Sequence, residues 1–156
     1  MSAVRCLGSA GFPDIPGQRA LKLFQDRIGR TAARAKTFPQ LAGYGIELEH
    51  AGARCSFAVA SSNQRRKDQG ARAALSEAHY VMELFGLTSF AWIWLDMALA
   101  SVRHVDHADA ETLDFHLGKL QTCRYVFFHR LVETEKLIDI IVRPDASVSG
   151  MRDEWF

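Results

Sequence analysis

Proline is absent from residues 40–143, because the four prolines of the chain stand at positions 13, 16, 39 and 144. A proline inside a helix removes a backbone hydrogen bond and breaks or kinks the helix, so this stretch can form long helices. Its apolar residues recur every three or four positions, which is the spacing of one helix face. The sequence therefore predicts an all-α protein.

Cysteine is also scarce, with only Cys6, Cys55 and Cys123, and no Cys-x-x-Cys pair occurs. An odd number of widely spaced cysteines is typical neither of a disulfide framework nor of a structural zinc site. We expect reduced thiols in a cytoplasmic protein. Cys55 and Cys123 fall within helical patterns and are predicted to be small core residues.

Neither sign of charge dominates, since 19 basic and 18 acidic side chains give a net charge of +1. The densest basic run, Arg65-Arg66-Lys67, is followed at once by Asp68. Nucleic-acid binding usually needs a broader basic surface. We expect this run to lie in a solvated helix end or turn, and we expect no nucleic-acid partner.

Motifs of nucleotide-binding and hydrolytic enzymes are missing: no Gly-x-Gly-x-x-Gly, phosphate loop or hydrolase elbow occurs. Six histidines raise the question of a metal, and Glu47 and His50 have the Glu-x-x-His spacing of di-iron bundles. A di-iron site needs a second such motif, and none is found. His104 and His107 flank Asp106, but a specific site needs a further ligand. We expect no metal and no cofactor.

One stretch, residues 81–102, is apolar and long enough to span a membrane, but it contains Glu83 and Asp96. Each carboxylate near the centre of a bilayer costs about 2.5–3.5 kcal/mol. Residues 1–17 hold no apolar block of signal-peptide length. The interpretation we favour is a core helix and no membrane association.

Apolar spacing predicts four helices, at about residues 16–38, 39–62, 72–103 and 110–143, with Asp109 as the N-cap of the last. Residues 63–70 are polar and fit either a loop or a solvated helix extension. Short connections between long helices favour an up-down four-helix bundle of antiparallel helices. The bundle would occupy residues 16–143, between a loose N-terminal arm (1–15) and a C-terminal tail (144–156).

Asp96 is the ionisable residue in the middle of the apolar third helix. A buried carboxylate needs a cation or hydrogen bonds. Lys119 and Arg124 on the fourth helix are the predicted partners, and the pair would tether the two helices.

Residues 84–125 contain a distinctive sequence pattern. The third predicted helix contains Leu84-Phe85-Gly86 and then Trp92-x-Trp94, and the fourth contains Lys119-Leu120-x-Thr122-x-Arg124-Tyr125. This pattern resembles the helical domain that follows the flavin-binding body in a subgroup of bacterial acyl-CoA dehydrogenases. The resemblance covers about residues 18–143 and is strongest from Leu84 onward. Cys123 stands where that family usually has alanine.

The resemblance implies an accessory domain rather than a catalytic one. The segments that bind FAD and supply the catalytic glutamate in the family are not found in these 156 residues, so we expect no enzymatic role. An apolar face that normally packs on the dehydrogenase body would then be covered by self-association or by a dehydrogenase subunit.

Two other hypotheses remain open. The bundle could bind acyl-CoA or another apolar acid in a slot walled by aromatic rings, Phe128 among them, with a cation at its mouth, or it could be an enzyme that uses a histidine and an acidic group. The candidate ligand or interface residues are Trp92, Trp94, Asp96, Lys119, Arg124 and Phe127.

Overall fold

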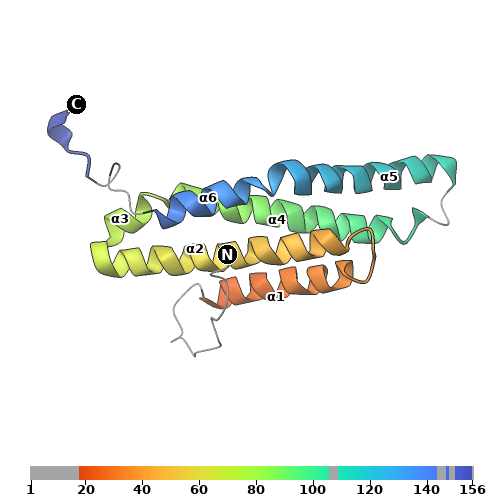
Figure 1. Ribbon diagram of the computed structural model, residues 1–156, viewed down its shortest axis with the longest axis horizontal. Helices are drawn as coiled ribbons and strands as arrows, with labels where there is room; N and C mark the ends of the chain where they lie inside the picture. The colour runs from red at the N-terminus through yellow and green to blue at the C-terminus, as the bar shows by residue number, and fades with distance from the viewer. Residues whose placement is uncertain (1–17, 106–108, 144–146, 148–149, 156) are drawn as a thin grey trace.

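The computed structural model describes residues 18–105, 109–143, 147 and 150–155, and these are mostly helical (Figure 1). Among the described residues there is no strand. The elements are α1 (Gln18–Ala35), α2 (Ala42–Gln69), α3 (Ala71–Leu75), α4 (Ala78–Ser101), α5 (Ala110–Tyr125), the π-helical segment η2 (Val126–Arg130), α6 (Glu133–Val142) and the short 3₁₀ helix η3 (Asp153–Trp155). The all-α class is confirmed. The expected arm at residues 1–15 and much of the expected tail lie outside the described residues.

The long helices lie lengthwise beside one another (Figure 1). α1 packs on α2 and α4, and α4 also packs on α2, α5 and α6. This central place of α4 fits its sequence, which is apolar nearly all round, because such a helix loses its exposed apolar surface only by packing on several neighbours. The up-down order of the four predicted helices stays a prediction.

Small residues let α1 and α2 approach each other closely. A Cβ atom added at Gly45 would stand 2.7 Å from the backbone oxygen of Ala32, and one added at Gly52 would stand 2.9 Å from Oε1 of Gln25. Both glycines are buried inside α2. These glycines therefore serve helix packing rather than a turn.

The polar segment 63–70, for which the sequence allowed either a loop or a helix extension, is a helix extension. α2 continues through it to Gln69 and ends at Gly70, whose φ of 88° is a conformation that suits glycine. The N–H of Gly70 donates a hydrogen bond to the carbonyl of Arg66. This stop places the short helix α3 beyond the end of α2 (Figure 1).

The third and fourth predicted helices are both interrupted. Residues 76–77 form a turn between α3 and α4, where the Ser76 hydroxyl donates to the carbonyl of Ala73 at 2.7 Å. In the fourth, η2 inserts a wider turn, closed by a hydrogen bond of 2.9 Å from the N–H of Leu131 to the carbonyl of Val126. Hydrogen bonds of serine side chains to nearby backbone compete with the helix, and a π turn is a local adjustment that apolar periodicity does not reveal.

Asp109 caps α5 as predicted, because its carboxylate accepts a hydrogen bond of 2.9 Å from the N–H of Thr112. The hydroxyl and the N–H of Thr112 together lower the pKa of Asp109. The cap therefore carries a negative charge at the positive end of the helix.

The core consists of two neighbouring clusters. The larger contains Leu48, Leu95, Leu99, Val126 and Phe127 with smaller residues around them, and the other contains Leu84, Leu137 and Ile141. Cys55 and Cys123 are fully buried, which confirms them as core residues. Residues 71–101 satisfy the length and composition of a membrane-spanning helix, but a core helix satisfies the same criteria, and the inner side of α4 is buried in both clusters.

Candidate interaction surface

Large apolar side chains lie exposed together on one side of α4 and α5. On α4, Phe90 is 44% exposed and Ile93 is 52% exposed, and Trp94 is half-buried beside them. Phe90 stands three residues before Ile93 and four before Trp94, so it borders both of them on the helix surface. Phe115 of α5 is 59% exposed. We call Phe90, Ile93, Trp94, Phe115 and Lys119 the α4–α5 face.

Lys119 joins the two helices on this face. Its Nζ lies 5.4 Å from the centre of the Trp94 ring and 5.0 Å from the centre of the Phe115 ring. The rings of Phe90 and Trp94 meet edge to face, with their centres 6.3 Å apart. A cation over an aromatic face contributes about 0.5–1 kcal/mol at an exposed site. The face thus combines apolar area with one positive charge.

The other predicted site residues are not gathered on this face. Trp92 points to α1, where its Nε1–H donates to the hydroxyl of Thr31 at 2.9 Å. Phe127 is buried against the ring of Tyr44, with 4.8 Å between ring centres. The guanidinium of Arg124 lies 5.7 Å from the centre of the Phe128 ring. Trp92, Trp94 and Phe127 therefore face three different helices, namely α1, α5 and α2.

The prediction for Asp96 was wrong in its burial and in its partner. The side chain is 55% exposed and pairs with Arg34 of α1 at 3.0 Å, not with Lys119 or Arg124. Residues two apart in a helix point to nearly opposite sides, so Asp96 cannot share the side of Trp94. It instead shares the side of Trp92, four residues earlier, and both reach α1.

Asp96 can therefore be replaced at little cost. We expect Asp96→Ala and Asp96→Leu each to change the free energy of unfolding by less than about 1 kcal/mol, because an exposed ion pair contributes no more than that. Thermal melting of the two variants beside wild type measures this. A loss of several kcal/mol in the alanine variant alone would contradict it, since that pattern belongs to a buried charge left unpaired.

One comparison with known proteins identifies the domain. The family model described as "Acetyl-CoA dehydrogenase C-terminal like" matches residues 24–152. The chain belongs to this family. No curated protein and no solved structure matches it.

The structure gives a packing role to several of the residues on which the family resemblance rests. Leu84 is fully buried, and the Phe85 ring lies 5.3 Å from that of Phe24 on α1. Trp92 links α4 to α1, and Trp94 with Lys119 links α4 to α5. In this chain, then, Phe85 and Trp92 contact α1, and Trp94 contacts Lys119 of α5.

The buried thiols are poorly suited to chemistry. Burial raises the pKa of Cys55 to about 11 and that of Cys123 to about 12. Because the thiolate is the nucleophile, both are inert near neutral pH. His50 and Glu47, the half motif of the sequence, lie exposed with 3.9 Å between Nδ1 and Oε2. In the part of the chain that the structure describes, no three metal-binding side chains come together.

Sequence reasoning missed Phe115 and did not single out Phe90 and Ile93. α4 is apolar on nearly every side, so periodicity does not mark which side meets solvent. The spacing of Phe115 and Lys119, four apart on α5, is the signal that could have placed both beside Trp94.

Proposed function

We propose that this chain is a non-catalytic accessory module of acyl-CoA dehydrogenase-type metabolism, which acts by self-association or by docking on a dehydrogenase through the α4–α5 face. Family membership supports the metabolic setting. The exposed apolar area of Phe90, Ile93 and Phe115 carries the proposal of docking. We also take the four long helical segments as an up-down bundle, which the short connection at residues 36–41 supports.

The composition of the face favours a protein partner. Apolar side chains grouped on a surface and rimmed by polar ones mark interaction sites, and aromatic residues are enriched at the centre of interfaces. Within the described residues, Lys119 contacts two rings rather than a carboxylate. A partner that places an acidic side chain over Lys119 and apolar side chains on Ile93 would complement both parts of the face.

The chemistry of the described residues is compatible with a packing role. The two thiols there are held protonated by burial. No described cluster has the ligands of a metal centre. Packing on a partner needs only the apolar area and the charge that the α4–α5 face offers.

Ile93→Asp tests the face, with Leu23→Asp as its matched control. Leu23 lies on α1 and is also 52% exposed, so both variants place the same charge on an equally exposed apolar position. We expect wild type to sediment above its monomer mass of 17.5 kDa at micromolar concentration, and Leu23→Asp to do the same. Ile93→Asp should weaken association by at least about tenfold, because an isoleucine buried at the contact is lost.

Sedimentation velocity across a concentration series measures these states. Equal association of the two variants would contradict the role of the face. If wild type stays monomeric, self-association is excluded. Docking on a dehydrogenase then remains, and copurification from the native host tests it.

A further inference from the structure

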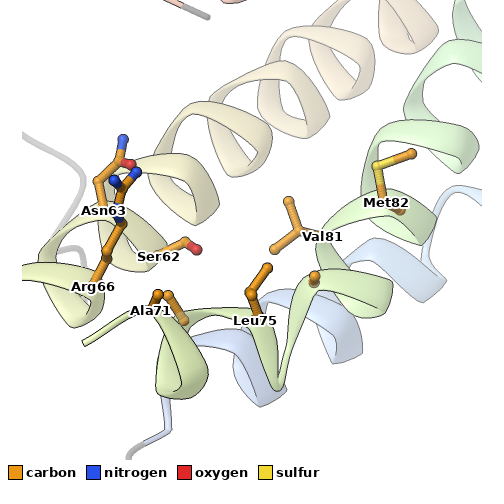
Figure 2. A pocket seen from close by; sticks show the side chains of 9 residues that line it. Ser62, Asn63, Arg66, Ala71, Leu75, Val81 and Met82 are labelled. Atoms are coloured by element: carbon orange, nitrogen blue, oxygen red, sulfur yellow. The ribbon is translucent and has the colours of Figure 1, made fainter. Parts of the chain in front are cut away.

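A second surface feature lies at the other end of α4, where α2, α3 and α4 meet (Figure 2). It is a cleft of about 460 Å³, within the size range of small-molecule sites. The cleft is independent of the α4–α5 face, because the two share no residue. Its lining residues are Ser62, Asn63, Arg66, Ala71, Ala74, Leu75, Ala78, Val81 and Met82.

The cleft is polar at one end and apolar along the rest of its length. Asn63 and Arg66 lie at one end in Figure 2 and Met82 at the other, with Leu75 and Val81 between them. Leu75 is 68% exposed and Met82 is 72% exposed. A ligand that covers these two side chains would remove their apolar surface from water, which favours binding.

Arg66 differs from its neighbour Arg65 in having no acidic partner among the residues that the structure describes. Arg65 pairs with Glu77 and donates to the carbonyl of Ile141 at 2.9 Å. The nearby carboxylate of Asp68 accepts from the side-chain amide of Gln64. Among the described residues, no ion pair or hydrogen bond engages the guanidinium of Arg66, so this exposed cation can pair with an anion that enters the cleft.

We propose that this cleft binds a medium-chain carboxylate. The carboxylate pairs with Arg66, with Asn63 as a further donor, and the hydrocarbon chain lies along Leu75, Val81 and Met82. Planar guanidinium groups bind carboxylates through two parallel hydrogen bonds, and the apolar walls select a hydrocarbon rather than a polar body. Each methylene that enters the cleft should strengthen binding by about fourfold.

Titration of the full chain with sodium octanoate, followed by amide chemical shifts, tests the proposal. We expect shifts at the cleft residues and weaker binding of octan-1-ol, which has the chain without the charge. Arg66→Gln should weaken octanoate binding by about tenfold. Lys67→Gln removes an equal charge one residue away, outside the cleft lining, and should leave binding within about twofold. Ala74→Leu, which fills the cleft, should also weaken it.

Several results would overturn the proposal. These are an absence of shifts at about 10 mM octanoate, shifts that map to the α4–α5 face, or equal losses in the Arg66 and Lys67 variants. Tighter binding of octanoyl-CoA than of octanoate would show that a CoA ester, not a free carboxylate, is the ligand. Ile93→Asp should bind octanoate as wild type does. The result of this test is therefore independent of the result of the test of the proposed function.

Discussion

Arg65→Met should lower the free energy of unfolding by about 3–5 kcal/mol, because it leaves the carboxylate of Glu77 buried without its cation. The side chains of Arg65 and Glu77 are only 12% and 13% exposed. Arg65 also donates to the carbonyl of Ile141 near the end of α6. One guanidinium thus connects α2, the start of α4 and the end of α6. Its loss removes the interactions that link these three helices.

The double variant Arg65→Met/Glu77→Leu separates an unpaired charge from lost packing. It removes both charges, so it should recover most of the stability that the single variant loses. Lys67→Met, an exposed change two residues along α2, should stay within about 0.5 kcal/mol of wild type. Urea denaturation measures the free energy of unfolding of each variant. A double variant no more stable than Arg65→Met would show that the unpaired carboxylate of Glu77 is not the cause of the loss.

Gly45→Ala should lower the free energy of unfolding by about 1–3 kcal/mol, even though alanine is the better helix former, because it overpacks the contact between α1 and α2. The new Cβ would stand 2.7 Å from the backbone oxygen of Ala32 and 3.3 Å from the Cβ of Ala35. Backbone atoms of a packed helix cannot move aside alone, so the two helices must separate. Thermal and urea unfolding both report the loss.

Two glycines serve as controls for this prediction. Gly29, on α1, has nothing within 4 Å of an added Cβ, so Gly29→Ala should stabilise the protein by up to about 1 kcal/mol. Gly52→Ala would meet the end of the Gln25 side chain, which can move, and should fall between the other two. If Gly45→Ala and Gly29→Ala were equally stabilising, α1 and α2 would not be in close contact at Gly45.

The sequence was sufficient for the helical class but not for every helix boundary. Lack of proline and the spacing of apolar residues predicted the helices, and the side chain of Asp109 predicted the start of α5. The stop at Gly70 depends on a positive φ that glycine permits but does not require. Periodicity likewise gave no sign of η2, since one wider turn keeps the residues on both sides of it helical.

The candidate site was predicted in part. Trp94 and Lys119 were named from the sequence, and the structure brings them together. Asp96 was wrongly placed in the core because its neighbours along the chain are apolar, whereas its own side of α4 borders α1 and solvent. Sequence neighbours describe the composition of a helix, and only its packing decides which side is covered. For the same reason, the cleft at Arg66 could not be predicted from the sequence. It is formed only by the packing of α2, α3 and α4.

Copurification from the native host tests the docking role of the α4–α5 face most directly. Wild type, Ile93→Asp and Leu23→Asp would each be tagged, expressed beside a differently tagged wild-type copy, and analysed by quantitative mass spectrometry. We predict that wild type and Leu23→Asp recover either the second copy or a flavin-containing acyl-CoA dehydrogenase, and that Ile93→Asp loses it. Recovery of neither protein by wild type, or the same recovery by all three, would contradict an interaction module that works through this face.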